Sequence, residues 1–526
     1  MRASAEPEAP VREVPATAER PAAAEALHSI LTNSSLLIAA QLVASAMGMA
    51  LTILVSRGLG DAQFGRFHLA LSLTTMFGVG VEFGLSQVLA RSVARHRGLA
   101  RAYLRRALAT VAVLGAVFYA AVLGAATALG YPPAVRSLVL ILGGLMVAEA
   151  SAQVLAAVFQ AHERMLVPAL ARVTGNALML ALVIAALRAG HGAGTVAGIL
   201  VATAFVRVAI QASAVGRLPG FRAPAPATPG WRGLLAAGFP FLLANGLGVL
   251  FFRVDVVMLG RLTADATVGW YGVANRLMDA FNFVPQFLTM ATFPVAARLW
   301  LTSPAAFRAT VRKTFQLLVV VTVPVAVSVH VFAREVVGLL FTLEAYGPAV
   351  PILRIHAASL ALVFMDFYLV GILMAIGRER RWITIAVGAC ILNPALNRLL
   401  IPLADARWGN GGIGAAVTML VTEACVLTAV VRSLPRGTFG RESVRVVRRA
   451  VGLGVALAAA LVAGRAAGVP WMLAAALGAL AYLGAVLQLR LLPPDVVAWL
   501  GSGLNVLDIR PKPVGWRAEN VKNDKA

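Results

Sequence analysis

The sequence predicts an all-α polytopic membrane protein of about 14 transmembrane helices, built as two pseudo-symmetric six-helix lobes plus two C-terminal helices. Three observations support this prediction: an apolar composition, arginine clusters that alternate along the chain, and an internal repeat. Of the 526 residues, 60% are hydrophobic and 13% are charged, whereas soluble domains have roughly 45–50% apolar and about 25% charged residues. Such an excess is expected where the outer surface faces lipid.

Apolar runs of transmembrane length recur along the whole chain. A bilayer core about 30 Å thick needs roughly 20 residues of helix, and backbone groups inside lipid must be hydrogen-bonded within their own segment. Each run is therefore predicted to be a helix. The runs lie at 30–54, 64–88, 104–129, 135–159, 166–187, 191–213, 232–259, 268–292, 312–333, 351–375, 382–402, 411–431, 446–466 and 470–490.

These runs suggest a division of the chain into lobes and tails. The predicted divisions are a disordered cytoplasmic tail (1–27), an N-lobe (28–215), a cytoplasmic linker (216–231), a C-lobe (232–432), two further helices (433–490) and a C-terminal cytoplasmic tail (491–526). The first tail is rich in Ala, Pro and Glu and lacks the basic-then-apolar order of a signal peptide.

The net charge of +23 comes mostly from arginine. The arginines cluster in every second loop, at 91–106, 298–313, 378–381 and 432–449, and the loops between carry few. Basic loops stay on the cytoplasmic side, so both termini are predicted to be cytoplasmic, in a bacterial-type cytoplasmic (inner) membrane. Because the charge follows the loops and not one amphipathic face, nucleic acid is not an expected partner.

The chain repeats itself with a shift of 204 residues. Seven positions of the first helical hairpin match the second half: Arg57 with Arg261, Asp61 with Asp265, Ala62 with Ala266, Gly65 with Gly269, Phe67 with Tyr271, Ala70 with Ala274 and Leu73 with Leu277. Later pairs match with a shift nearer 215. A duplicated six-helix unit gives two lobes of the same orientation, an arrangement typical of transporters that rock around a central site. A chance match between hairpins of similar composition is the alternative.

Two short, glycine-punctuated segments, Arg57–Gly65 and Arg261–Gly269, fall at matching places in the repeats. They are predicted to be tight extracellular turns, with Asp61 or Thr267 capping the helix that follows.

Eleven ionisable residues fall inside the predicted helices: Glu82, Glu149, Arg172, Arg207, Arg253, Asp255, Arg276, Asp279, Arg354, Asp366 and Glu423. Each costs about 2.5–3.5 kcal/mol at mid-bilayer on insertion scales. A polar interior between two lobes would accommodate them.

The arginines are the candidate contacts for a substrate. Arg253 lies on a helix loosened by glycine and proline, which suggests gating, or it is one half of an interfacial pair. Arg276 and Asp279 share a helix face and either line the cavity or neutralise each other. Arg172 and Arg207 either line the cavity or reach the headgroups of the bilayer.

The acidic residues have two interpretations. Asp255, Asp279, Glu82, Glu149, Asp366 and Glu423 either balance the arginines or bind a coupling cation. Structural pairing is the alternative for each.

No enzyme-type site is predicted. Only Cys390 and Cys425 are present, both in apolar runs, and the histidines have no metal-ligand spacing. The chain has no glycine-rich phosphate loop ending in Lys-Ser/Thr. Neither a metal nor another cofactor is expected.

The first hairpin reads Leu59-Gly60-Asp61-Ala62-Gln63-Phe64-Gly65, then Glu82-Phe83-Gly84, followed by a basic loop from Arg91. Residues 253–277 have a similar sequence pattern, with Leu259-Gly260 and Gly269-Trp270-Tyr271. From about residue 30 to 490, this pattern resembles the O-antigen-like oligosaccharide flippases of the polysaccharide-biosynthesis type, in the multidrug/oligosaccharidyl-lipid/polysaccharide exporter superfamily.

The resemblance implies a flippase that moves a polyprenyl-diphosphate-linked oligosaccharide from the inner to the outer leaflet by alternating access, for cell-surface polysaccharide biosynthesis. Arg253 and Arg276, and more weakly Arg172 and Arg207, would attract the diphosphate, and the last two helices would form a groove for the lipid tail. Expected partners are the lipid-linked glycan, membrane lipids, and a polysaccharide polymerase with its glycosyltransferases. The open alternatives are a lipid II flippase, a multidrug/cation antiporter of the same superfamily, and a polytopic glycosyltransferase or polymerase.

Overall fold

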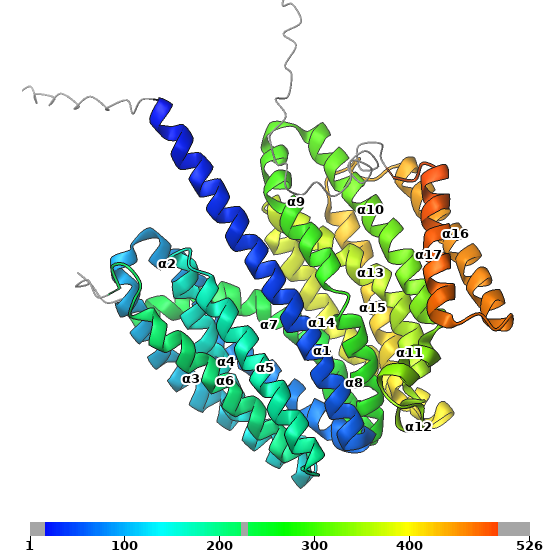
Figure 1. The fold of residues 1–526 in the computed structure, drawn as a ribbon, viewed down its shortest axis with the longest axis horizontal. Helices are drawn as coiled ribbons and strands as arrows, with labels where there is room; N and C mark the ends of the chain where they lie inside the picture. Colours follow the sequence, from blue (N-terminus) through cyan, green and yellow to red (C-terminus); the bar gives the residue numbers. More distant parts are fainter. Residues whose placement is uncertain (1–15, 222–229, 493–526) are drawn as a thin grey trace, which may run out of the picture.

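The computed structural model describes residues 16–221 and 230–492, with side chains from Leu42 onward. The described chain is helical and forms two bundles that lie side by side (Figure 1). The N-lobe contains α1 (Ala16–Glu82), α2 (Leu85–Arg95), a short 3₁₀ turn (Arg97–Leu99), α3 (Ala100–Ala128), α4 (Pro133–Ala161), α5 (Leu166–Arg188) and α6 (Ala193–Val215).

The C-lobe follows in the second half of the chain. It contains α7 (Trp231–Leu262), α8 (Asp265–Asp279), α9 (Phe283–Thr302), α10 (Pro304–Val331), α11 (Ala333–Leu340), α12 (Leu343–Tyr346), α13 (Ala349–Ala375), α14 (Glu379–Trp408) and α15 (Gly411–Ser433). The last two helices, α16 (Arg441–Ala466) and α17 (Trp471–Gln488), lie at the outer edge of the C-lobe, against α10 (Figure 1).

The chain crosses the membrane as often as the sequence predicts. Twelve helices among the described residues are long and apolar enough to span it. One of them, Leu42–Arg95, is 54 residues long and bends into two arms, which adds a crossing. The pair α8–α9, interrupted at residues 280–282, supplies another. The all-α fold with about 14 crossings is therefore confirmed.

The bend in α1 lies at Gly60, where the sequence predicts a loop. Its φ of 74° and ψ of 173° belong to a region essentially restricted to glycine, and helical residues continue on both sides. The predicted caps are wrong. Thr267 is buried inside α8, whose N-cap is Ala264, and the Asp61 carboxylate accepts only the adjacent Ala62 N–H (2.8 Å) and an N–H from the other lobe described below.

The predicted tails and linker are only partly described. α1 begins at Ala16, inside the segment predicted as a disordered tail. Residues 1–15, 222–229 and 493–526 lie outside the described part of the chain.

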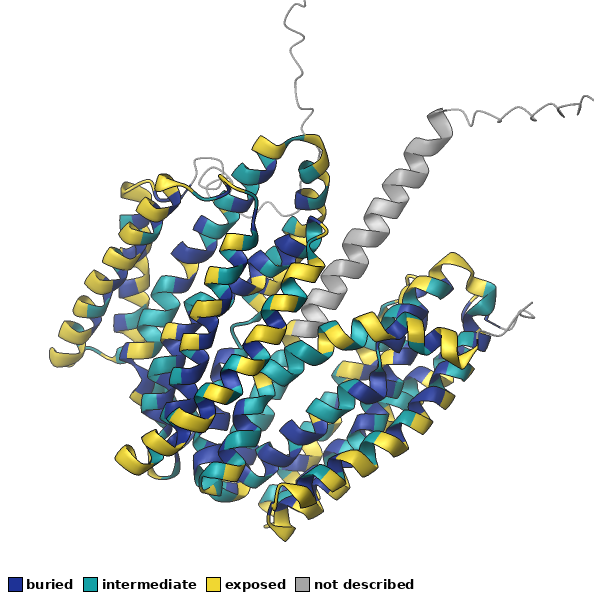
Figure 2. Cartoon of the chain, turned by 180° about the vertical axis from the view of Figure 1, so that it is seen from behind, coloured by how far each residue is buried: buried dark blue, intermediate teal, exposed yellow. Residues whose placement is uncertain are grey.

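Large apolar side chains cover the outside of both bundles. Leu301 is 84% exposed, Ile391 67% and Leu480 66%, and exposed positions follow the outer faces of the helices (Figure 2). Soluble proteins rarely expose contiguous apolar surface on this scale, so this surface faces lipid.

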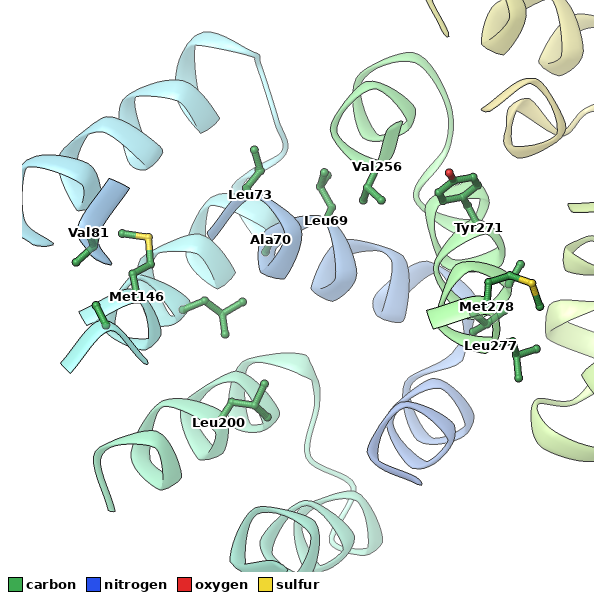
Figure 3. Close-up of a cluster of buried hydrophobic side chains, with 14 of the residues drawn as sticks. Leu69, Ala70, Leu73, Val81, Met146, Leu200, Val256, Tyr271, Leu277 and Met278 are labelled. Carbon is green, nitrogen blue, oxygen red and sulfur yellow. The ribbon is translucent and has the colours of Figure 1, made fainter. Parts of the chain in front are cut away.

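The second arm of α1 packs against both lobes. Figure 3 shows Leu69, Ala70 and Leu73 of this arm among buried side chains that include Val256 of α7 and Tyr271 of α8. All five are no more than 2% exposed. The arm therefore connects the two lobes and, as described next, forms part of the wall of a cavity between them.

Two ends of the molecule are named here for later use. The "basic end" carries the connections 96–99, 376–378 and 434–440, which lie within the arginine clusters at 91–106, 378–381 and 432–449 or next to them. The "bend end" carries Gly60, the connections 129–132 and 263–264, and α11–α12.

Candidate functional site

A cavity of about 860 Å³ lies between the lobes. Both arms of α1 line it, together with α4, α5 and α6 on the N-lobe side and α7 and α8 on the C-lobe side. Six charged residues are in its wall: Glu82, Glu149, Arg207, Arg253, Arg276 and Asp279. Their formal charges sum to zero, so the cavity as a whole is not cationic. It is positive only on the part of its wall where arginines outnumber carboxylates.

On the N-lobe wall, Arg207 of α6 forms an ion pair with Glu149 of α4. Its side chain is only 17% exposed, and Gly175 of α5 leaves room for its methylene groups, because a Cβ at that position would overlap them. Arg207 therefore lies inside the cavity wall and does not reach toward headgroups. The Glu149 carboxylate balances the charge of Arg207, which agrees with the interpretation that this acidic residue offsets an arginine.

The C-lobe wall carries Arg253 of α7 and Arg276 of α8 at similar depth. Arg253 lies nine residues before the end of α7 and Arg276 eleven residues after the start of α8, or about 13 and 16 Å along the helices. Gly48 of α1 leaves room for the Arg276 guanidinium, since a Cβ there would overlap Nη2. Two guanidinium groups thus reach the same cavity from one lobe.

Only one carboxylate on this wall opposes the two arginines. Asp279 is an electrostatic neighbour of both Arg253 and Arg276, but no salt bridge joins it to either within the described structure. Its other contact is a long one, with Asn282 Nδ2 at 3.5 Å from Oδ1. The predicted neutralised pair of Arg276 and Asp279 is not formed, and this wall keeps a local excess of one positive charge.

Glu82 lines the cavity in a structural role. Its carboxylate accepts the backbone N–H groups of Gly84 (2.8 Å) and Ser86 (2.9 Å) and the Ser86 hydroxyl (2.6 Å). The chain leaves the helical conformation here, at Phe83 and Gly84, where φ is positive. Glu82 caps α2 across this break, and it does not balance an arginine.

Three of the predicted acids lie elsewhere, in a C-lobe carboxylate cluster of Asp255, Asp366 and Glu423. All three are buried, and none lines the cavity. The Asp255 carboxylate accepts the Tyr271 hydroxyl (2.8 Å) and Asn397 Nδ2 (2.6 Å). The predicted role of balancing the cavity arginines is therefore wrong for this cluster.

The other two members of the cluster share an acidic neighbourhood. Glu423 interacts electrostatically with Asp366 and with Asp255. One oxygen of Asp366 and one of Glu423 have no hydrogen-bond partner. Within the described residues, no group of three or more His, Cys, Asp or Glu is arranged to hold a metal ion.

Arg172 is exposed on α5 and is absent from the cavity wall. Of the four arginines predicted to contact the substrate, Arg207, Arg253 and Arg276 line the cavity of this structure, and Arg172 does not. The α16–α17 pair contributes no residue to the cavity wall, and its role as a groove for the lipid tail remains a prediction.

Sequence reasoning missed the neutral polar residues of the wall, among them His68, Ser72, Gln153, Asn176 and Asn245. His68 stacks on Phe64 and lies close enough to Arg253 and Arg276 to interact electrostatically with both. A helical pattern could have revealed part of this face, because His68, Ser72, Thr75 and Glu82 recur on one side of α1.

Comparisons with known proteins agree with this architecture. The chain matches the family described as "Polysaccharide biosynthesis protein" over residues 30–300 and the family described as "MatE" over residues 240–399. No curated protein matches the chain.

Solved structures share the fold at low sequence identity. The lipid II flippase MurJ in an inward closed conformation aligns with a TM-score of 0.67 at 12% identity, covering 88% of this chain and 99% of that one. An inward-facing multidrug resistance MATE family transporter of the MOP superfamily aligns with 0.62 at 16% identity, covering 74% and 96%. A MOP superfamily transporter from Pyrococcus furiosus, described as having a binding pocket of reverse polarity, aligns with a TM-score of 0.51 at 16% identity, covering 77% of this chain and 94% of that one.

Because the first family match covers just over half of the sequence, and because the fold agrees with it, the chain belongs to the polysaccharide biosynthesis protein family. It is a multi-pass membrane protein with the fold of MOP superfamily transporters.

Proposed function

We propose that this transporter moves a lipid-linked oligosaccharide across the membrane, with the anionic diphosphate headgroup passing through the cavity between the lobes. The observation that supports this most directly is the C-lobe wall, where Arg253 and Arg276 face the cavity against the single carboxylate of Asp279. Guanidinium groups bind phosphate oxygens through paired, charge-assisted hydrogen bonds. Placed well inside the membrane, they would offset the cost of removing the headgroup from water.

The direction of transport follows from the charge pattern. The basic end would face the cytoplasm under the positive-inside rule, so the cargo would enter there and leave at the bend end. An inside-negative potential favours export of an anion by about 2.3 kcal/mol per charge per 100 mV, or about 5 kcal/mol for two charges. The potential and the arginines therefore act in the same direction.

A flipping assay with purified protein in liposomes tests this function. The substrate is a fluorescent oligosaccharide on polyprenyl diphosphate, and its arrival in the outer leaflet is measured by a glycosidase added outside. Arg253→Ala and Arg276→Ala should each slow flipping at least about tenfold, which corresponds to one charge-assisted hydrogen bond. Arg136→Ala is the matched control, because Arg136 is exposed at the bend end and is not part of the cavity wall.

Two outcomes would contradict the proposal. If both alanine variants flip the glycan as fast as the unmodified protein, the guanidinium groups do not carry the headgroup. If the protein instead moves a cationic dye against a proton or sodium gradient and ignores the glycan, it is an antiporter of the same superfamily.

The C-lobe carboxylate cluster is the proposed site of ion coupling. Two of its oxygens lack a hydrogen-bond partner in a buried, acidic setting, and a proton or Na⁺ there would offset the repulsion between the carboxylates. Flipping measured against a pH gradient and, separately, a sodium gradient identifies the ion. Asp366→Asn should abolish that dependence; a rate that responds to neither gradient in the unmodified protein would rule out coupling at this cluster.

A further inference from the structure

The two lobes meet at the bend end through residues that occupy matching positions in the two repeats. Gly65 of α1 and Gly269 of α8 are 204 residues apart. A Cβ at Gly65 would overlap the backbone carbonyl of Asp265, and a Cβ at Gly269 would overlap that of Asp61. Gly65 therefore contacts Asp265, and Gly269 contacts Asp61. Asp61 and Asp265 are counterparts in the two repeats, and each lies four residues before the glycine of its own repeat.

The residue after each glycine repeats this exchange with its side chain. Arg66 donates from Nε to Asp265 Oδ2 at 2.6 Å, and Trp270 donates from Nε1 to Asp61 Oδ2 at 3.0 Å. Arg66 and Trp270 are also 204 residues apart. Both aspartates therefore receive an N–H group from the opposite lobe, although the two donors differ chemically.

A third pair of contacts joins each lobe to the first helix of the other. The Tyr131 hydroxyl donates to the Val257 carbonyl of α7 at 2.8 Å, and the Tyr346 hydroxyl donates to the Ser56 carbonyl of α1 at 2.9 Å. The two tyrosines are 215 residues apart, in the matching sequences Tyr131-Pro-Pro-Ala-Val and Tyr346-Gly-Pro-Ala-Val.

Both phenols keep their protons at neutral pH. Burial raises the pKa of Tyr131 to about 12, against a smaller opposing effect of Arg261. Burial, with the negative charge of Asp61, raises the pKa of Tyr346 as well. Both hydroxyl groups therefore remain hydrogen-bond donors under physiological conditions.

We propose that these reciprocal contacts form a releasable latch that holds the cavity closed at the bend end, and that the transporter opens there when the latch parts. The bend-end latch consists of Asp61, Gly65, Arg66, Tyr131, Asp265, Gly269, Trp270 and Tyr346. It joins the two lobes around the axis that relates the repeats, so its two halves open together.

The chemistry of these contacts suits a joint that must part repeatedly. The glycines bring backbone against backbone with no interlocking side chains. The polar groups lie at an end of the bundle, where water can replace each lost partner, so the net cost of separating them is small compared with burying them unpaired.

The latch is also connected to the cavity by the helices that carry it. Phe64 and His68 of α1 line the cavity beside the Gly65 contact, and Arg276 follows Gly269 on α8 by seven residues, about two turns. A cargo bound to the wall therefore acts on the same two helices that carry the latch.

Thiol labelling of the full-length protein in intact cells tests the latch without reference to the cargo. Cys390 and Cys425 are first replaced by serine, and Gln153→Cys, in the cavity wall, reports access to a membrane-impermeant maleimide added outside. His191→Cys, exposed at the bend end, checks in a separate strain that this end faces the reagent. The labelling rate of the cavity cysteine then measures how often the bend end opens.

Weakening the latch should speed labelling. We expect about a fivefold increase for Tyr131→Phe and for Tyr346→Phe, each of which removes one hydrogen bond, and a larger increase for Arg66→Asp, which sets two carboxylates against each other. The double exchange of Arg66→Asp with Asp265→Arg should return the rate close to the starting value. Gly65→Ala and Gly269→Ala should both raise the rate, whereas Gly198→Ala, where a Cβ meets open space, should not.

Unchanged labelling in both tyrosine variants and in Arg66→Asp would overturn the proposal. The same holds if the double exchange labels as fast as Arg66→Asp alone, because the ion pair would then not hold the lobes together. The conservative tyrosine variants keep the test informative if a glycine variant fails to fold. No labelling of His191→Cys would overturn the proposal, because the latch would then not lie on the outer side of the membrane.

Discussion

The Arg207–Glu149 ion pair in the N-lobe wall can either support the structure or take part in binding, and its two single variants distinguish these roles. Glu149→Gln keeps the shape of the side chain but leaves Arg207 with an unbalanced charge; Arg207→Gln does the reverse. Breaking a fully buried pair by removing one partner costs about 3–5 kcal/mol, and an exposed pair contributes about 0.2–1 kcal/mol. Since the Arg207 side chain is 17% exposed and that of Glu149 39%, we expect each variant to lose about 1–2 kcal/mol of stability.

The two variants should differ in how they bind an anion. Glu149→Gln adds one net positive charge to the cavity and should lower the KM for the lipid-linked glycan about three- to tenfold, while Arg207→Gln adds a net negative charge and should raise it by a similar factor. Thermal unfolding followed by tryptophan fluorescence gives the stability, and the flipping assay gives KM. If both variants raise KM equally, the pair serves only to hold α4 against α6, and the electrostatic reasoning about the cavity is wrong.

Three further predictions concern the backbone and the titratable groups. Gly60→Ala should lower the unfolding temperature sharply, because the glycine-only conformation at the bend costs about 1–3 kcal/mol for other residues; Gly124→Ala, where a Cβ meets nothing within 4 Å, should be neutral or stabilising in the same assay. Glu82→Gln should cost about 1 kcal/mol through the weakened cap of α2, measured by thermal unfolding, and an unchanged unfolding temperature would contradict the capping role. The labelling rate of the cavity cysteine is divided by that of His191→Cys at the same pH, because the thiolate is the reactive form and its fraction rises with pH. This ratio should stay constant from pH 6 to 9 and rise as the pH passes from about 10, the ordinary pKa of tyrosine, toward the value of about 12 for Tyr131; a rise that persists unchanged in Tyr131→Phe would assign it to another group.

The sequence predicts the helices well because their cause is local. Each crossing needs its own run of apolar residues, so composition alone locates them. The repeat is also readable, since Asp61, Gly65 and their counterparts keep their spacing. The bend was missed because glycine next to aspartate is typical of a loop, whereas Gly60 allows α1 to turn while helix continues on both sides.

The partners of the buried charges could not be predicted from the sequence. Arg207 meets Glu149 across 58 positions and Asp255 meets Asn397 across 142, so these pairs depend on how whole helices pack. Spacing along a helix even misled at Arg276 and Asp279, which share a face without forming a salt bridge. The local sequence identifies the charged residues that lie inside the membrane. The packing of the helices decides whether each of them lines a cavity, caps a helix or lies beside another acidic residue.

The two repeats agree in the contacts proposed to close the molecule and differ in the residues that line its cavity. At the latch, both repeats keep the glycine and the aspartate, and both keep the tyrosine. In the cavity wall they differ: the counterparts of Arg253, Arg276 and Asp279 under the shift of 204 are Met49, Ser72 and Thr75, and His68 corresponds to Gly272, which leaves room for its ring.

These differences follow from what each region must do. Two lobes that separate around a shared axis need equivalent contacts on both sides, because an unmatched contact would hold one side after the other had parted. A charged headgroup needs the opposite arrangement, since a ring of arginines on both lobes would bind it too tightly to release. A symmetric latch, combined with a cavity wall whose positive excess lies on one lobe, is therefore the arrangement expected of a transporter that must close completely and still release an anion.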